Sequence, residues 1–515
     1  ATTEIYTLSL HDALPIWASS GITAPLVTVE VHLSNGMAGL NMVGLPEAAV
    51  KESKDRVRSA LMNANFEFPA RRITINLAPA DLPKEGGRFD LPIALGILAA
   101  SRQIPQQALA DYEFIGELAL SGELRPIRGV LPVALGAYQS GRRLIVPYLN
   151  AQEATLAKQA TVLSARHLLD VCAHLKGEQT LSACLPDALN KENGSSLSAD
   201  LADVKGQQHA KRALEIAAAG RHSLLFIGPP GTGKTMLASR LPGILPEISD
   251  EEALQVAAVA SVSSDGFNPR HWKRIPFRSP HHSSSSVALV GGGRPPRPGE
   301  ISLAHHGILF LDELPEFSRH VLECLREPLE SGCITISRAA YQAVFPAQFQ
   351  FIAAMNPCPC GYAGDSTEHC QCTKEQIRRY MGRVSGPLLD RIDMQVEVAK
   401  LPAAVLAGSE NYASDNSLAV RARVSGARAL QFKRQGKCNA TLTVPELDYH
   451  SALQEEAKHL LHQVMTKFML SARVYHRIIK VARTAADLEG SVSITVQHIS
   501  EALRYRCLDR MKIII

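Results

Sequence analysis

Residues 228–235 form a glycine-rich loop whose residue types fit the binding of a polyphosphate. The sequence GPPGTGKT matches the pattern G-x-x-x-x-G-K-[ST], and it follows the apolar run Leu224–Ile227, which predicts a buried strand. Backbone N–H groups must wrap a phosphate closely, and the small Gly231 and Gly233 allow this approach. The loop therefore predicts a nucleotide site made of Gly228, Pro229, Pro230, Gly231, Thr232, Gly233, Lys234 and Thr235.

Two side chains of this loop and two carboxylates further along the chain predict phosphate chemistry. Lys234 places a positive charge beside the outer phosphates, and the Thr235 hydroxyl can ligate Mg²⁺. The run Ile308–Leu311 predicts a second buried strand, which ends in Asp312 and Glu313. At the carboxyl edge of a parallel sheet, Asp312 is expected in the Mg²⁺ shell and Glu313 beside the attacking water. The alternative is that these two carboxylates only cap a helix at the end of the strand. The phosphate loop upstream favours the catalytic interpretation.

Three further polar residues are candidates for contact with a nucleotide. Asn356 ends the apolar run Phe351–Met355 and could bond the γ-phosphate or the water, or act only as a turn residue before Pro357. Arg391 lies in the run LLDRID, and Arg473 opens a predicted helix. Either could be a solvated surface arginine. An arginine that reaches ATP from a neighbouring subunit would stabilise the charge of the transition state.

Four cysteines lie close together in the sequence and have the chemistry of metal ligands. They form two C-x-C pairs separated by nine residues, with His369 beside the second pair. Four thiolates on two short turns can close around Zn²⁺ and leave no open position, which favours a structural site over a catalytic one. Four reduced thiols in a loop are the alternative. The cluster at 358–372 comprises Cys358, Cys360, Cys370 and Cys372.

Composition limits the class of protein and its compartment. The chain has 515 residues, of which 46% are hydrophobic and 20% charged, as in a soluble globular protein of about three domains. The net charge of +4 does not indicate nucleic acid by itself, so such a partner needs a local patch. The longest nearly apolar stretch, Leu91–Ala100, is too short to span a membrane, and the ten scattered cysteines do not indicate secreted disulfides. We therefore expect a cytoplasmic protein without a membrane segment.

Hydrophobic periodicity divides the chain into three folded parts. Residues 1–16 show no useful period, and we interpret them as a non-native segment outside the fold. Mixed strands and helices over 20–175 predict an α+β domain with helices on one face of a sheet. A polar linker over 176–202 leads to a parallel-sheet core over 203–400, and helical spacing over 401–515 predicts a helical domain. The predicted fold class is therefore multidomain α/β.

Two segments of the core carry residues suited to nucleic acid. The insertion 277–300 is dense in Gly, Ser, Pro, His and Arg, and 334–341 predicts one arm of a hairpin. In a ring pore, cations would contact phosphates and a tyrosine would stack on a base; the alternative is that these loops only join strands and pack between subunits. The candidates are Arg278, His281, His282, Arg294, Arg338 and Tyr341. A solvated face is the favoured interpretation for the basic residues of one C-terminal helix, which are Arg421, Arg423, Arg428, Lys433 and Arg434.

Together these motifs resemble an AAA+ ATPase of the magnesium-chelatase-like branch. The phosphate loop, FLDE, LLDRID and SARVYHR carry the likeness, and PFRSPHH, ALVGGG, PRPGEISLAHHGILFLDELPEF and NPCPCG narrow it to the bacterial YifB/ComM family, one member of which acts as a helicase in natural transformation. The resemblance covers residues 20–510. It implies ATP and Mg²⁺ as cofactors, Asn356 as first sensor, Arg391 as a finger supplied in trans, and Arg473 as second sensor. A finger supplied in trans implies a homo-oligomeric ring, a hexamer by the resemblance.

The N-terminal part resembles the Lon protease domain in its ribosomal-S5-like fold. Lon-type proteases need a serine nucleophile and a lysine base, and the matching stretches here place Arg88 and Leu131 at those positions. Without nucleophile or base, covalent acyl transfer has no route. The resemblance therefore implies a scaffold or binding domain without the catalytic dyad.

The residues and the resemblance lead to one expected function and two alternatives. We expect a ring-forming ATPase that couples ATP hydrolysis to translocation on, or remodelling of, single-stranded or branched DNA. The resemblance implies branch migration in natural transformation or homologous recombination. The first alternative is the motor of a magnesium-chelatase complex, although the D-x-S-x-S motif of its partner is missing from the sequence. The second is a regulatory scaffold whose ATP state sets assembly, with turnover that ignores DNA.

Overall fold

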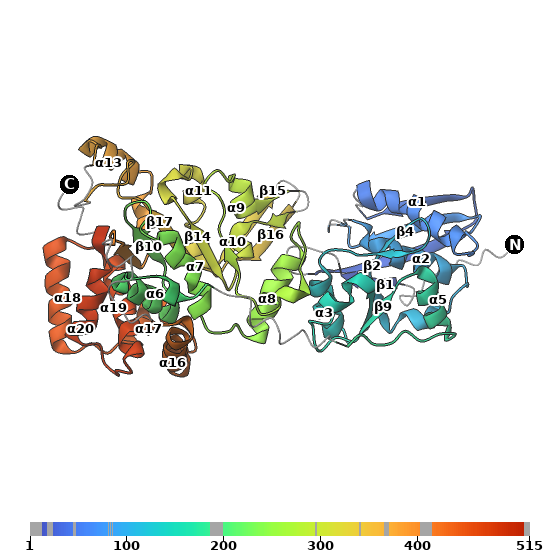
Figure 1. The fold of residues 1–515 in the computed structure, drawn as a ribbon. Coiled ribbons are helices and arrows are strands. Elements are labelled where there is room, and N and C mark those ends of the chain that lie inside the picture. The colour runs from blue at the N-terminus through green and yellow to red at the C-terminus, as the bar shows by residue number, and fades with distance from the viewer. Residues whose placement is uncertain are drawn as a thin grey trace.

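Three parts follow one another along the molecule in the computed structural model: an N-terminal part of sheets and helices, a central part built on a parallel sheet, and a group of C-terminal helices (Figure 1). No helix in the described ranges is both long and apolar enough to cross a membrane. The structure describes residues 13–17, 24–44, 48–80, 82, 84, 86–185, 199–293, 296–338, 341–364, 370–401 and 415–508.

Two main sheets form the N-terminal part. Its elements are β1 (Ala13–Trp17), β2 (Leu26–Ser34), β3 (Gly39–Val43), α1 (Ala48–Asn63), β4 (Arg72–Ala78), α2 (Asp90–Ala100), β5 (Tyr112–Phe114), β6 (Glu117–Leu118), β7 (Leu124–Arg125), α3 (Val130–Gln139), β8 (Arg143–Pro147), α4 (Ala151–Ala154), β9 (Val162–Ala165) and α5 (Leu168–Lys176). The first sheet has the order β1-β2-β4-β3, and only its β3–β4 pair is parallel. The second sheet, β5-β8-β9, is parallel throughout. The prediction of a single sheet was wrong because the flanking strands β5 and β9 are too short to show a period.

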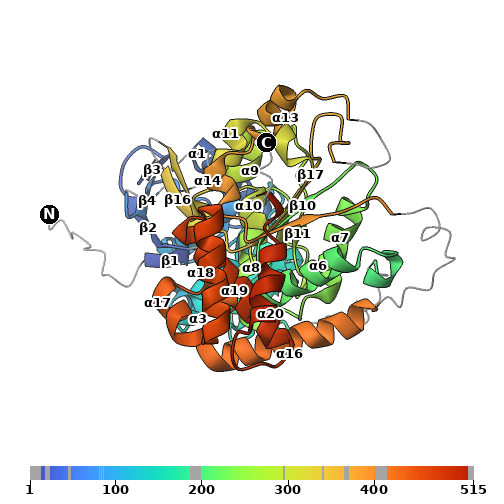
Figure 2. The same cartoon turned by 90° about the vertical axis from the view of Figure 1, so that its left-hand side faces the viewer.

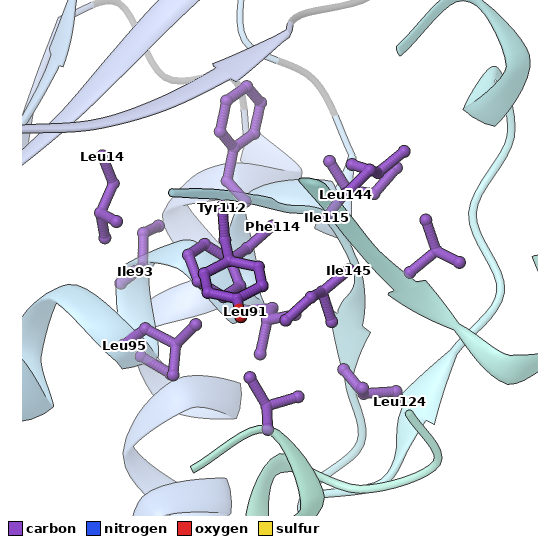
Figure 3. Packing of buried hydrophobic residues seen from close by; sticks show 14 of the residues in the cluster. Leu14, Leu91, Ile93, Leu95, Tyr112, Phe114, Ile115, Leu124, Leu144 and Ile145 are labelled. Carbon is purple, nitrogen blue, oxygen red and sulfur yellow. The ribbon is translucent and has the colours of Figure 1, made fainter. Parts of the chain in front are cut away.

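The prediction that residues 1–16 lie outside the fold was wrong for residues 13–16. The strand β1 pairs with β2 in antiparallel register, from Ala13 opposite Glu30 to Trp17 opposite Leu26. Leu14 is only 3% exposed and lies in the buried cluster of this part (Figure 3). The strand is at the edge of its sheet, where a proline is tolerated although it donates no N–H. Residues 1–12 lie outside the described residues.

The two residues at the positions of the protease dyad make contacts that support the fold. Leu131, at the position of the lysine base, is completely buried in the N-terminal core. Arg88, at the position of the nucleophile, donates a hydrogen bond from Nη2 to the backbone oxygen of Arg128 at 3.0 Å. Neither side chain can attack an acyl group as the nucleophile or accept the proton of a nucleophile as the base.

The central part is a five-stranded parallel sheet with apolar side chains on both faces. Its elements are α6 (Gln208–Gly220), β10 (Leu224–Ile227), α7 (Lys234–Ile244), α8 (Asp250–Ser261), β11 (Phe277–Arg278), α9 (Ser286–Val290), β12 (Gly291–Gly292), β13 (Arg297–Pro298), α10 (Glu300–Leu303), β14 (Ile308–Leu311), α11 (Arg319–Glu323), α12 (Pro328–Ser331), β15 (Cys333–Arg338), β16 (Tyr341–Pro346), β17 (Gln350–Met355), α13 (Lys374–Met381), α14 (Gly386–Leu389) and β18 (Met394–Glu397). The strand order is β11-β14-β17-β10-β18. Within β10, Leu224 and Phe226 belong to one buried cluster, and Leu225 and Ile227 belong to another. Burial on both faces explains the continuous apolar runs of these strands.

The described C-terminal part is mainly helical. Its helices are α16 (Ser417–Gln435), α17 (Val444–His450), α18 (Glu455–Phe468), α19 (Ala472–Leu488) and α20 (Val496–Arg504). Figure 2 shows α16, α18, α19 and α20 on the side of the molecule that faces the viewer. Val424 of α16 and Ile478 of α19 lie in the same buried cluster as Leu224 and Phe226, so these helices cover one side of the central sheet.

The interpretation of the basic residues on α16 as a solvated face was wrong for three arginines. Arg421 donates two hydrogen bonds to the backbone oxygen of Gly243, at 3.0 and 2.6 Å. Arg428 donates two to the backbone oxygen of Ala218 near the end of α6, at 3.1 and 2.7 Å. Carbonyl groups at a helix end lack partners within the helix, and a guanidinium can satisfy them. The third is Arg434, which is paired with the buried Asp487 at 2.6 Å.

The helix α8 joins the N-terminal and central parts into one packed unit. Its residues Ala257 and Ala258 lie in the same buried cluster as the N-terminal core. The backbone N–H of Gly129 donates to the carbonyl oxygen of Ser261 at 3.0 Å. In Figure 1, α8 lies between α3 and α10. The two parts are therefore held together by direct contacts as well as by the linker predicted over 176–202.

Replacing Glu153 by Gln should stabilise the protein more at high pH than at low pH. Glu153 of α4 is buried and its carboxyl faces Ser261 of α8. Burial raises its pKa from 4.5 to about 7. The folded state thus binds the proton more tightly than the unfolded state. The free energy of unfolding therefore falls by about 3 kcal/mol as the pH rises from 4.5 to about 7.

The measurement is the melting temperature of Glu153→Gln and of the unchanged protein at about pH 5 and about pH 8. The variant's advantage should grow with pH. Glu67→Gln removes an exposed carboxylate and serves as the control. An advantage of the Glu153 variant that is equal at both pH values would contradict the prediction.

Candidate nucleotide-binding and catalytic site

The phosphate loop joins β10 to α7 in a backbone conformation that requires glycine. Gly231 and Gly233 have φ of 75° and 88°, in the left-handed region that other residues rarely adopt. A Cβ atom on Gly228 would lie 2.2 Å from the backbone oxygen of Val398, which leaves no space for a side chain. The helix α7 begins at Lys234, so its free N–H groups lie at the end of this loop. The loop and helix together have the geometry that suits an anion.

Lys234 bridges the phosphate loop and the end of β17. Its Nζ donates to the backbone oxygens of Gly228 at 2.7 Å and Pro229 at 2.8 Å. It also lies 3.1 Å from Oδ1 of Asn356. Burial lowers the pKa of Lys234. The structure therefore brings the predicted phosphate lysine and the predicted first sensor into contact, although 122 positions separate them in the chain.

The two predicted Mg²⁺ ligands also meet at this edge of the sheet. The Thr235 hydroxyl donates to Oδ2 of Asp312 at 2.6 Å. Oδ1 of the same carboxylate accepts the backbone N–H of Glu313 at 2.9 Å. Glu313 has a φ of 52°, an uncommon value for a residue other than glycine. A hydroxyl and a carboxylate held this close are suitable oxygen ligands for one Mg²⁺.

A histidine of the insertion pairs with Glu313, a contact that the sequence does not predict. Nδ1 of His282 lies 3.2 Å from Oε2 of Glu313. The ring of His282 is 4.0 Å from that of His281 and meets the edge of Phe317 at 6.5 Å, measured between ring centroids. His282 was predicted as a DNA contact, and neither its type nor its spacing signals a carboxylate 31 residues away. The structure therefore connects the insertion to the predicted water-activating group.

The four clustered cysteines converge in space at the end of β17. The Sγ atom of Cys358 lies 3.3 Å from that of Cys360 and 3.7 Å from that of Cys370. All four Sγ atoms lie within 4.8 Å of one another. A tetrahedral zinc site with Zn–S bonds of about 2.3 Å has sulfur atoms about 3.8 Å apart. The geometry therefore fits a four-thiolate site. His369 lies outside the described residues.

Comparisons with known proteins match almost the whole chain. Residues 200–406 match the family model of magnesium chelatase, subunit ChlI; residues 29–150 match that of subunit ChlI of Mg-chelatase; and residues 414–506 match that of the ChlI C-terminal region. The chain is 54% identical to the competence protein ComM of Haemophilus influenzae, over 96% of this chain and 97% of that protein. It is 51% identical to the protein YifB of Escherichia coli over the same shares. This chain belongs to the ComM and YifB family of magnesium-chelatase-like AAA+ ATPases. A shorter likeness, at 25% identity over 28% of this chain and 19% of the relative, is to the Lon protease of Geobacter metallireducens.

The two arginines that the ComM and YifB resemblance implies as finger and second sensor lie apart from the phosphate loop. Arg391 is held by Glu330 at 2.5 Å and by the backbone oxygen of Pro387 at 2.7 Å, and its side chain is only 9% exposed. Arg473 is exposed at the start of α19. Within the described part of this single chain, neither contacts the loop or the paired carboxylates. A finger that acts on a neighbouring subunit is expected to show this separation.

Asp393, two residues after Arg391, connects the C-terminal helices to the central sheet. Its carboxylate accepts the backbone N–H of Ser223 at 3.0 Å and forms a close ion pair with Arg477 of α19. Burial alone would raise the pKa of Asp393, but Arg477 and His222 hold it well below its usual range. Arg477 also donates to the backbone oxygen of Arg391 at 2.9 Å. The charged network thus fixes the start of α19 against the segment that carries Arg391.

The predicted DNA contacts have different surroundings in the structure. Arg278 was expected to contact phosphates but forms a two-point pair with Glu300, in which both distances are 2.6 Å. His281 contacts the hydroxyl of Ser283 at 2.8 Å. Arg294 lies outside the described residues. The segment 334–341 was predicted as one arm of a hairpin, but it includes residues of both arms. The hairpin is formed by β15 and β16, and Arg338 stands opposite Tyr341 at its tip.

Proposed function

We propose that this protein is a ring-forming ATPase that couples ATP hydrolysis to translocation on, or remodelling of, single-stranded or branched DNA. The observation that carries the proposal is the convergence of the phosphate loop, Asp312, Glu313 and Asn356 at the carboxyl edge of one parallel sheet. In open parallel sheets this edge is where ligands bind. The relative ComM is a competence protein, which supports DNA as the substrate, and branch migration in transformation or recombination is the process that the family resemblance implies.

ATP and Mg²⁺ fit the residues at this edge. Thr235 and Asp312 would hold Mg²⁺, which neutralises negative charge on the β- and γ-phosphates when it is bound. Lys234 is placed to exchange its carbonyl partners for phosphate oxygens. Glu313 is the group that would accept the proton of the attacking water, and Asn356 would orient that water or the γ-phosphate. Arg391 from a neighbouring subunit and Arg473 would stabilise the charge that develops in the transition state.

A homo-oligomeric ring, a hexamer by resemblance, is part of the proposal because Arg391 does not reach the phosphate loop of its own chain. The β15–β16 hairpin projects from the central part and is a candidate for a pore loop that contacts DNA (Figure 1). A cytoplasmic location is proposed because ATP, DNA and reduced thiols occur there together. A structural Zn²⁺ at the cysteine cluster completes the set of cofactors.

The experiment is ATP turnover by the full chain with no DNA, with single-stranded DNA and with branched DNA. We expect several-fold faster turnover with DNA, with a steep decrease at high salt because phosphate contacts release counterions. Turnover that ignores DNA while oligomer size follows ATP would replace this proposal by the regulatory scaffold.

The family models named after magnesium chelatase keep a chelatase motor as a second candidate. Turnover that responds to a metal-chelatase partner and not to DNA would favour it.

A further inference from the structure

The cysteine cluster touches the phosphate loop directly. Gly361 follows Cys360 and has a φ of 90°. A Cβ atom at this position would lie 2.7 Å from Cδ and 3.2 Å from Cγ of Pro230, the second proline of GPPGTGKT. Only glycine fits at such a close approach. The turn that carries two of the cysteines therefore packs against the loop that would hold the phosphates.

A second connection runs from the cluster through Asn356. Cys358 follows Asn356 by two residues and is fully buried. Asn356 is the residue that contacts Nζ of Lys234 at 3.1 Å. The turn after Cys358 is closed by the backbone N–H of Gly361, which donates to the carbonyl oxygen of Cys358 at 3.0 Å. The first cysteine pair therefore lies directly after the residue that contacts Lys234, at the end of β17.

A third connection runs through α13, which begins two residues after Cys372. Its Tyr380 is buried, and its hydroxyl lies beside the backbone of Asn356. The cluster thus joins the end of β17, the phosphate loop and α13. Three of the four cysteines are only partly buried, so packing of apolar surface does not account for their close approach.

We propose that Zn²⁺ bound by the four cysteines clamps the end of β17 to the phosphate loop, so that zinc occupancy sets the affinity for ATP. This inference rests on the proposed nucleotide site. The four sulfur atoms lie within 4.8 Å of one another, and as thiolates they would repel one another unless a cation offset their charge. Zn²⁺ does so in a closed four-coordinate site with no open position. Its role is therefore to hold Asn356 and Pro230 in place and not to act on a substrate.

Coupling between the two sites must be reciprocal. If zinc favours the loop conformation that binds ATP, bound ATP must raise the affinity for zinc by the same factor. The first experiment measures the zinc content of the full chain by atomic emission, and then measures how much zinc is released at equilibrium to a coloured chelator with and without ATP. We expect about one zinc per chain and a zinc affinity at least about fivefold higher with saturating ATP. A chain without zinc, or a zinc affinity unaffected by bound ATP, would overturn the proposal.

Two variants separate zinc binding from its effect on ATP. Cys370→Ser with Cys372→Ser should lose zinc and bind a fluorescent ATP analogue at least about tenfold more weakly. Gly361→Ala keeps all four thiols, so it should retain zinc but weaken ATP binding through its contact with Pro230. The matched control is Cys324→Ser with Cys333→Ser, two partly buried cysteines outside the cluster.

Folding of each variant is checked by circular dichroism. If the double cysteine variant does not fold, Gly361→Ala and the zinc-release experiment still test the proposal. Full ATP affinity in a folded zinc-free variant, or in Gly361→Ala, would show that the clamp does not exist. Failure of the unchanged zinc-loaded protein to bind ATP would instead contradict the proposed function.

Discussion

Replacing Glu313 by Gln is expected to lower ATP turnover at least about 100-fold while ATP affinity stays within about threefold of its original value. The amide has the shape of the carboxylate but cannot accept the proton of the attacking water. The backbone contact from residue 313 to Asp312 and the contact from Thr235 to Asp312 do not involve the replaced group, so the proposed Mg²⁺ ligands stay in place. The measurements are steady-state phosphate release and binding of a fluorescent ATP analogue.

The control for this variant comes from the same turn of the chain. Glu316 pairs with Arg383 at 2.9 Å, and both side chains are about half exposed to solvent. Glu316→Gln should therefore keep most of the turnover. If the Glu313 variant retains more than about a tenth of the original turnover, the assignment of Glu313 as the water-activating group is wrong. If it loses ATP binding as well, the substitution has disturbed the loop and not only the chemistry.

Replacing Arg391 by Ala is expected to lower turnover at least about 100-fold, and mixing this variant with Glu313→Gln should restore part of it. The Arg391 variant keeps its own phosphate loop and Glu313, because Arg391 contacts neither within one chain. The Glu313 variant keeps its arginine. In a random equal mixture, about a quarter of the subunit interfaces should combine an intact Glu313 with an intact Arg391 from the neighbour.

The measurement is turnover of each variant alone and of the mixture, with fluorescence energy transfer between differently labelled variants to show that mixed rings form. Arg379→Ala is the matched control, because this arginine is 80% exposed and its partner among the described residues is Glu375 on the same helix. Mixed rings without any recovery would contradict a finger that acts in trans. Recovery above the two separate rates would establish that one catalytic site is built from two chains.

The sequence alone predicted those parts of the site that are contiguous in the chain. The phosphate loop follows its strand directly, and Asp312 and Asn356 each end an apolar run. Parallel strands bring their carboxyl ends to one edge, so short motifs at three strand ends can be placed together before any contact is known. Helical spacing likewise predicted helices over 401–515, and Arg473 does lie at the start of one of them, α19 (Ala472–Leu488).

The tertiary structure alone decided which side chains meet across long stretches of chain. Arg428 caps α6 from 210 residues away, His282 pairs with Glu313, and Gly361 packs on Pro230. The edge strand β1 was missed because five residues around a proline show too little alternation to predict pairing. Periodicity reports which face of an element is apolar, but the partner of a polar group depends on how the elements pack. For this protein, the sequence determined the chemistry of the candidate nucleotide site, and packing determined which residues hold that chemistry in place.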